Sequence, residues 1–204
     1  LHRIGISQFN PNEFHIIQLA ILLEALIFSI GLAARIRYTK RLSNTDHLTG
    51  SFNRRYFFEV CESILAKNAR KDKAIAVATL DIDYFKRIND TYGHDVGDLA
   101  IQEMATILNK NLRVSDLVAR FGGEEYCILL EDITLENTQL LFEKIRLAFE
   151  KNEINIKDST LKYTVSIGIS YGKSKDINEM IKVSDDALYE AKDTGRNKIV
   201  MYNV

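Results

Sequence analysis

Hydrophobic positions divide the chain into one long apolar segment and a region of shorter, patterned runs. Residues 14–34 are apolar at nearly every position, and His15 and Glu24 would lie on opposite sides of a helical wheel. At about 1.5 Å per residue, a helix of this length measures roughly 31 Å, enough to cross a bilayer core. The segment therefore predicts a transmembrane helix, and a buried or surface amphipathic helix is the alternative.

The charged residues around this segment predict its orientation. Basic residues follow it directly: Arg35, Arg37, Lys40 and Arg41. Because basic flanks favour the cytoplasmic side, we expect an extracytoplasmic lead-in over 1–13, a membrane span over 14–34, a helical connector over 35–45 and a cytoplasmic domain over 46–204. A secretory signal peptide fits less well, since no small-residue cleavage site follows and the basic residues come after the apolar core. Glu24 would cost about 2.5–3.5 kcal/mol at mid-membrane, so we expect it to face other helices.

The region 46–204 alternates between helical and strand-like patterns. Helical spacing occupies four segments: 56–65, 86–112, 135–150 and 177–195. Strand-like runs occupy 74–85, 161–172 and 198–202. Two further apolar runs flank Gly122–Gly123 and predict an antiparallel hairpin. The pattern predicts an α/β (α+β) domain with a mixed central β-sheet flanked by helices.

Composition narrows the function classes. The chain has 204 residues, 46% of them hydrophobic, which suffices for one good core. Its net charge of −1 gives no reason to expect a nucleic acid polymer as a partner. Cys61 and Cys127 lie in apolar patterns without metal-ligand spacing, so we expect buried thiols in a reducing cytoplasm. The start at Leu1 rather than Met suggests a fragment of a longer protein.

Two glycines and two glutamates meet at the turn of the predicted hairpin. Glycine tolerates positive φ and lets a ligand approach the backbone closely, whereas Glu124 and Glu125 repel each other and have no obvious packing role. A solvated hairpin tip and a phosphate-and-metal site are both compatible with this pattern. Asp81 and Asp83 alternate at the end of the strand 74–85, so only one can point at a given ligand unless the strand bends.

Four motifs in order resemble the GGDEF domain, the diguanylate cyclase family. They are DxLTG…NRR (46–55), DxDxFKxxND…GH…GD (81–98), RxGGEE (120–125) and YxAKxxGRN (189–197). Ser51, Glu124 and Tyr126 stand where the family usually has Leu, Asp and Phe, and the two hairpin changes keep a carboxylate and an aromatic ring. The resemblance implies a fold like nucleotidyl cyclases and polymerase palms. It also implies a homodimer that condenses two GTP into cyclic di-GMP with release of pyrophosphate.

The resemblance implies a metal site and a catalytic set. Asp81, Glu124 and the backbone carbonyl of Ile82 would hold Mg²⁺ or Mn²⁺, for which hard oxygen ligands are suited. Either Glu124 or Glu125 would help to deprotonate the attacking 3′-hydroxyl, and the sequence leaves that choice open. Lys86 joins them as a cation that neutralises phosphate charge during transfer.

Substrate-binding residues also follow from the resemblance: Asn89, His94, Asp98, Gly122, Gly123, Lys192 and Arg196. Asn89 and Asp98 fit the hydrogen-bonding edge of guanine, and His94 would shape the pocket. The two glycines would lie against the phosphates, which Lys192 and Arg196 would clamp.

Arg113 and Asp116 resemble the RxxD inhibitory site, at which the family binds its product. Arg stacks on guanine and grips phosphate, while Asp accepts from the guanine edge. We further expect Asp46 to pair with Arg120, and Asp83 to be structural. Together, the membrane-span pattern and the family resemblance predict an enzyme at a bacterial inner membrane with its catalytic domain in the cytoplasm. The alternative is a non-catalytic signalling module that binds GTP or cyclic di-GMP, which the retained hairpin carboxylates disfavour.

Overall fold

The computed structural model describes residues 11–156, 159–173 and 176–204, so most of the predicted lead-in 1–13 lies outside the described residues. Contacts divide the chain into two units, one ending at Ser43 and the other formed by Asn44–Val204. The described part of the first unit belongs to helix α1 (Pro11–Asn44), which runs without a break through the predicted span and most of the predicted connector. Within it, His15–Ile36 has a mean hydropathy of 2.3 and is long and apolar enough to cross a membrane.

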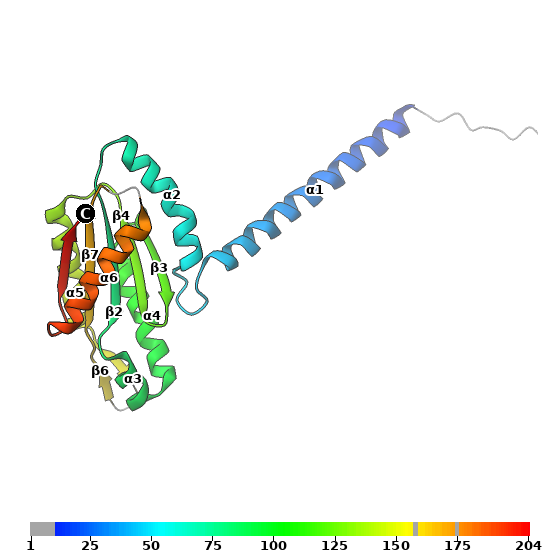
Figure 1. Cartoon of the computed structure of the whole chain (residues 1–204). Helices are drawn as coiled ribbons and strands as arrows, with labels where there is room; N and C mark the ends of the chain where they lie inside the picture. Colours follow the sequence, from blue (N-terminus) through cyan, green and yellow to red (C-terminus); the bar gives the residue numbers. More distant parts are fainter. Residues whose placement is uncertain (1–10, 157–158, 174–175) are drawn as a thin grey trace, which may run out of the picture. The chain divides into compact units, whose positions relative to one another are not determined.

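The described part of the second unit contains one six-stranded sheet in the order β1–β3–β4–β2–β7–β8 (Figure 1). Its strands are β1 (Phe52–Asn53), β2 (Ile75–Ile82), β3 (Leu117–Gly122), β4 (Glu125–Leu130), β7 (Val165–Gly172) and β8 (Ile199–Asn203). The central strand β2 runs antiparallel to both β4 and β7, whereas β1 on β3 and β8 on β7 are parallel. The predicted mixed sheet and its antiparallel hairpin β3–β4 are therefore confirmed.

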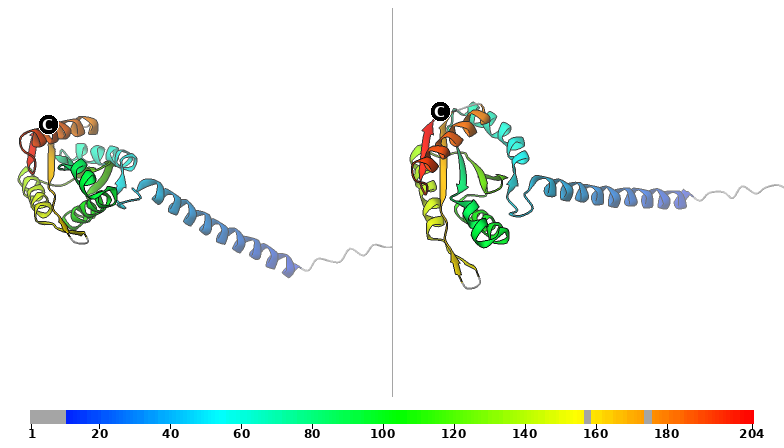
Figure 2. Two further views of the ribbon diagram at one scale, coloured as in Figure 1. Left: turned by 90° about the horizontal axis from the view of Figure 1, so that it is seen from below. Right: turned by 60° about the horizontal axis from the view of Figure 1, so that its bottom comes forward.

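Helices cover both faces of this sheet (Figures 1 and 2). Helices α2 (Arg54–Arg70) and α6 (Ile177–Asp193) lie on one face, and α4 (His94–Asn111) and α5 (Leu135–Lys151) lie on the other. Side chains alternate along β2, so Ile75 and Val77 pack toward α2 and α6, while Ala78 and Leu80 pack toward α4 and α5. Every residue of β2 is consequently buried, which explains its nearly continuous apolar sequence.

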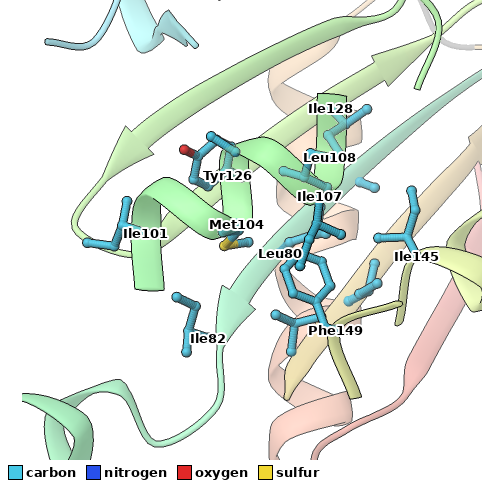
Figure 3. Packing of buried hydrophobic residues seen from close by; sticks show 14 of the residues in the cluster. Leu80, Ile82, Ile101, Met104, Ile107, Leu108, Tyr126, Ile128, Ile145 and Phe149 are labelled. Carbon is cyan, nitrogen blue, oxygen red and sulfur yellow. The ribbon is translucent and has the colours of Figure 1, made fainter. Parts of the chain in front are cut away.

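The larger core lies between β2 and the α4/α5 layer. Figure 3 shows Met104 and Leu108 of α4 and Phe149 of α5 close to Leu80 of β2. All four side chains are completely buried. Truncating a residue of this kind typically costs about 2–5 kcal/mol, so the core holds β2 firmly up to its polar end.

One predicted helix is wrong in its extent. The segment 86–112 forms two helices, α3 (Phe85–Tyr92) and α4, which are separated at Gly93. Gly93 has φ 85° and ψ 164°, a conformation that ends a helix and that glycine adopts without strain.

The predicted strand 161–172 is also wrong in its extent. Leu161 belongs to β6 (Ser159–Leu161), which pairs with β5 (Ile154–Ile156) in a separate two-stranded ribbon (Figure 2). The sheet strand begins only at Val165. Between the two strands, Tyr163 turns into the core, where its hydroxyl donates to the carbonyl of Ala100 at 3.1 Å.

The two cysteines are buried and free, as predicted. Burial raises the pKa of Cys61 to about 12 and raises the pKa of Cys127 as well. Both thiols therefore belong to the packing between the sheet and the α2/α6 layer.

Candidate active site

The polar end of β2 carries Asp81, whose side chain points toward α6. Asp81 is only 5% exposed. It forms an ion pair with Lys192 of α6, in which Asp81 Oδ1 and Lys192 Nζ are 2.8 Å apart. Burial raises the pKa of Asp81 against the hydrogen bond from Lys192, and the charges of Glu124 and Asp83 raise it further. A buried carboxylate with acidic neighbours needs positive charge, and Lys192 supplies it here.

Asp83 lies just beyond the end of β2 and has a different environment. It is 4% exposed and accepts hydrogen bonds from Thr164 Oγ1 at 2.6 Å, Ser166 Oγ at 2.6 Å and the backbone N–H of Asn197 at 3.0 Å. These bonds join β2 to β7 and to the chain after α6. Asp83 is thus a structural residue, as expected, and Asp81 is the carboxylate of the pair that faces the site.

The β3–β4 hairpin turn is fixed by Arg120. Its Nε donates to the carbonyl of Gly123 at 2.8 Å, and its Nη1 donates to Asp46 Oδ1 at 2.9 Å. The predicted pair between Asp46 and Arg120 is confirmed. Gly123 has φ 51°, and a Cβ atom at Gly122 or Gly123 would meet no other atom within 4 Å. The turn therefore offers open space directly above two glycines, where a ligand can approach the backbone.

The structure separates the two hairpin glutamates. Glu124, at the turn, lies close enough to Asp81 for its charge to raise the pKa of Asp81. Glu125 begins β4 and lies on the same strand face as Cys127, toward α2 and α6, where its charge raises the pKa of Asp185. The sequence alone could not assign the two glutamates to different neighbours.

The donor set beside Asp81 fits a hard divalent cation. Oxygen ligands gather at one end of β2. They are the carboxylates of Asp81 and Glu124 and the backbone carbonyl of Ile82, the last residue of the strand. Across residues 11–156, 159–173 and 176–204, no three His, Cys, Asp or Glu side chains converge as a ready-made metal cage. Mg²⁺ typically binds together with its ligand through one or two carboxylates plus phosphate oxygens and water, and Asp81 and Glu124 offer two carboxylates.

The predicted base-binding residues lie on α3 and α4, on either side of the break at Gly93. Asn89 Oδ1 is buried and has no hydrogen-bond partner among the described residues. A Cβ atom at Gly97 would lie 1.9 Å from this oxygen, so glycine is needed for Asn89 to occupy its place. Asp98 and His94 are exposed on α4. An unpaired amide oxygen next to exposed polar groups suits a ligand with N–H donors.

The predicted phosphate clamps lie at the end of α6 and on α3. Gly195, with φ 121°, follows the helix end as predicted, and Arg196 follows with φ 61°. The Arg196 guanidinium lies 4.5 Å from the ring centroid of Tyr84, which itself has φ 57°. Tyr84 could not be predicted as a site residue, because nothing in the sequence marks a tyrosine that adopts a left-handed conformation. Lys86 is exposed on α3.

The RxxD residues form a turn between α4 and β3. The backbone N–H of Arg113 donates to Asp116 Oδ2 at 2.8 Å, and the Arg113 side chain is exposed. They border a cavity of about 370 Å³ that also includes Ser51 and Val118. Burial raises the pKa of Asp116 against the bonds and charge of Arg113. This cavity shares no residue with the Asp81 site.

Comparison with known families matches this arrangement of motifs. A family model described as "Diguanylate cyclase, GGDEF domain" matches residues 43–198, which is most of the chain. The chain belongs to the GGDEF family. The GGDEF domain thus accounts for the second structural unit, and α1 precedes it.

Curated relatives of this GGDEF protein include named diguanylate cyclases. It is 39% identical over 183 residues to the probable diguanylate cyclase DgcT of Escherichia coli, covering 88% of this chain and 40% of the relative. It is 35% identical over 180 residues to the response regulator PleD of Caulobacter vibrioides, covering 81% of this chain and 40% of the relative. The chain therefore spans about two fifths of the length of these relatives.

Solved GGDEF structures share the fold. The coiled coil and GGDEF domain of DgcB from Caulobacter crescentus, in complex with c-di-GMP, matches with a TM-score of 0.84 and 26% identity, covering 91% of this chain and 99% of that chain. The active GGEEF domain of a diguanylate cyclase from Vibrio cholerae matches with a TM-score of 0.68 and 32% identity, covering 74% of this chain and 96% of that chain.

Proposed function

We propose that this chain is a diguanylate cyclase that condenses two GTP into cyclic di-GMP and two pyrophosphates. The observation that carries the proposal is the buried Asp81, bonded to Lys192 and within electrostatic reach of Glu124, which lies at the open Gly122–Gly123 turn. Phosphoryl transfer needs charge neutralisation and positioning, and this end of the sheet gathers groups for both.

In this proposal Asp81, Glu124 and the carbonyl of Ile82 hold Mg²⁺ or Mn²⁺. The cation, when bound, acts as a Lewis acid on the phosphate oxygens. Glu124 is the better supported ligand of the two glutamates because it lies near Asp81. Glu125 lies near Asp185 and borders the same cavity as Lys192, which supports a role for it at the attacking 3′-hydroxyl.

The remaining site residues bind the nucleotide. Asn89 and Asp98 accept hydrogen bonds from the N–H groups on the edge of guanine, and His94 borders that pocket. The buried Asn89 Oδ1, which has no partner among the described residues, supports this role. Lys86, Lys192 and Arg196 bind the phosphates. For Lys192 this means exchanging its partner Asp81 for phosphate oxygens.

A membrane-bound homodimer completes the proposal. Each domain carries one set of nucleotide-binding residues, so two substrates meet only if two domains face each other across a two-fold interface. The apolar segment His15–Ile36 would tether each copy to the bacterial inner membrane, with the catalytic domain in the cytoplasm.

The direct test is incubation of the purified full chain, in detergent micelles or nanodiscs, with GTP and Mg²⁺. Asp81→Asn removes the buried carboxylate, and Asp95→Asn is the matched control because Asp95 is exposed on α4. We expect cyclic di-GMP from the wild type and the control, and a loss of about 10²-fold or more for Asp81→Asn. Equal behaviour of wild type and Asp81→Asn contradicts the proposal. Tight nucleotide binding without turnover in a verified dimer supports the signalling module instead.

Product inhibition at the RxxD motif is part of the same proposal. The cavity beside Arg113 and Asp116 is large enough for part of a dinucleotide, and the structural relative DgcB was solved with c-di-GMP. We expect Arg113→Ala to relieve inhibition by added cyclic di-GMP while initial synthesis persists, measured as pyrophosphate release. Unchanged inhibition in that variant removes Arg113 from the inhibitory site.

A further inference from the structure

A second cavity adjoins the candidate active site from the α2/α6 side of the sheet. It has a volume of about 310 Å³ and lies between the start of α2, the hairpin strands and α6. Its lining includes Arg54, Phe121, Glu125, Asp185, Tyr189 and Lys192. Glu125 belongs to the hairpin and Lys192 bonds to Asp81, so the cavity borders the proposed reacting centre. None of the proposed guanine-binding residues borders it.

Arg54 is held in this cavity by aromatic rings. It is the first residue of α2, directly after the N-cap Asn53. Its guanidinium carbon lies 5.4 Å from the ring centroid of Phe121, on the hairpin, and 5.8 Å from that of Phe58. Such contacts orient a guanidinium without neutralising its charge. Through Phe121, Arg54 therefore packs on β3, the strand that leads into the Gly122–Gly123 turn.

The charge of Arg54 has no direct carboxylate partner among the described residues. Among the residues that the structure describes, no ion pair involves Arg54, whereas Arg120 pairs with Asp46 and Arg146 pairs with Glu143. The Arg54 side chain is also exposed, so an external ligand can reach it. The contacts with the two rings involve the guanidinium itself, but its N–H donors lie in the plane of the group and stay available for hydrogen bonds to a ligand.

The composition of the cavity calls for a cation when a phosphate enters. Glu125 and Asp185 bring two negative charges to its wall, against which Lys192 supplies one positive charge besides that of Arg54. A phosphate near this wall would be repelled unless a fixed positive group faced it. Arginine suits this task because its planar fork can donate two hydrogen bonds to phosphate oxygens.

We propose that Arg54 is a further catalytic residue, which donates to the oxygens of the α-phosphate at the reacting centre. This inference rests on the proposed diguanylate cyclase function. In the step concerned, the 3′-oxygen of one GTP forms a bond to the α-phosphorus of the other, and the bond from that phosphorus to pyrophosphate breaks. The hydroxyl proton goes to a hairpin carboxylate, and pyrophosphate leaves with the bonding electrons. Arg54 stabilises the charge on the phosphorus-bound oxygens during this exchange.

The test compares Arg54→Met and Arg54→Lys with Arg55→Met in the full chain. Methionine keeps an unbranched side chain of similar length without the charge, and lysine keeps the charge without the planar fork. Arg55 is the matched control, since it is the adjacent exposed arginine and donates to Asn44 instead. We expect kcat to fall about 10²–10³-fold in Arg54→Met, less in Arg54→Lys, and by less than about threefold in Arg55→Met.

Two further measurements separate catalysis from binding and folding. The KM for GTP and the affinity for its α,β-methylene analogue, which cannot release pyrophosphate, should change by less than about threefold in Arg54→Met. A kcat of Arg54→Met within threefold of wild type overturns the proposal, and so does a loss of analogue affinity in proportion to the loss of kcat.

If Arg54→Met fails to fold, Arg54→Lys decides the question. A lowered kcat at wild-type Tm supports the proposal, and a wild-type kcat overturns it. A wild-type chain without turnover overturns both proposals, whereas wild-type turnover with an unaffected Arg54→Met overturns this one alone.

Discussion

Asp46 connects the start of the GGDEF domain to its hairpin turn, and we expect Asp46→Asn to destabilise the domain. Asp46 Oδ1 accepts from Arg120 Nη1 at 2.9 Å, from the Thr49 N–H at 3.0 Å and from the Thr49 hydroxyl at 2.8 Å. The same Arg120 donates to the carbonyl of Gly123. Asparagine keeps the shape of the side chain but leaves Arg120 without its counter-ion.

The expected loss lies between two known cases. A hydrogen bond to a charged group contributes about 1.5–3 kcal/mol, and breaking a fully buried ion pair costs about 3–5 kcal/mol. The side chains of Arg120 and Asp46 are 13% and 16% exposed, so water still reaches the pair. We therefore expect a loss of about 2–3 kcal/mol in the free energy of unfolding. For a domain of this size, this lowers Tm by about 4–12 °C.

The effect should depend on pH in one direction. Burial alone would raise the pKa of Asp46, but the hydrogen bonds from Arg120 and Thr49 outweigh it and the pKa is lowered. The folded carboxylate therefore binds protons less readily than the unfolded one, whose pKa is about 3.9. The stabilisation is present above that pH and is lost as the pH falls through the lowered pKa of the folded state. The difference between wild type and variant should thus be constant near pH 7 and shrink in acid.

Thermal unfolding of the full chain in detergent, followed by circular dichroism, measures this difference. Arg120→Met and the double variant complete a double-mutant cycle, which isolates the coupling between the two side chains. Asp95→Asn controls for the loss of one exposed carboxylate. A variant that melts within about 1 °C of wild type at pH 7, or a difference that persists unchanged below the titration of Asp46, refutes the reasoning.

Three other predictions follow from close contacts and burial. Gly168→Ala would place a Cβ atom 2.1 Å from the backbone of α6. We expect the free energy of unfolding, measured with urea, to fall by about 3 kcal/mol or more, and a fall below about 1 kcal/mol contradicts this packing. Gly97→Ala would displace the Asn89 side chain, so the KM for GTP should rise about tenfold with little change in Tm. An unchanged KM would contradict the proposed role of Asn89 in binding guanine. Because burial raises their pKa, Cys61 and Cys127 should react with a thiol reagent at pH 8 only after denaturation, and rapid labelling of the folded chain contradicts their burial.

The sequence predicted the elements whose pattern is local and long. Helices α5 and α6 were predicted nearly to their ends because apolar spacing, a cap residue or a glycine stop mark them. The hairpin was predicted because Gly122–Gly123 separates two apolar strands. The pair of Asp46 and Arg120 came from the family motifs rather than from any pattern along the chain.

Other features depend on tertiary structure, and the sequence could not supply them. Helical periodicity continues across Gly93, so the break between α3 and α4 was missed. The left-handed conformation of Tyr84 is stabilised by its neighbours and carries no residue-type signal. The bond between Lys192 and Asp81 joins residues on different elements, and only the packing of α6 on the sheet brings them together.

The bond between Lys192 and Asp81 has a consequence for the order of binding. A free cation arriving alone must compete with an ammonium group that already neutralises Asp81, and the displaced lysine gains nothing in exchange. A cation that arrives with a triphosphate brings a new partner for Lys192 at the same moment, so the exchange of partners is complete. Under the proposed function, the domain would therefore respond to the nucleotide–metal complex and be insensitive to changes in the free cation. The lysine thereby favours binding of the complete substrate over binding of the cation alone.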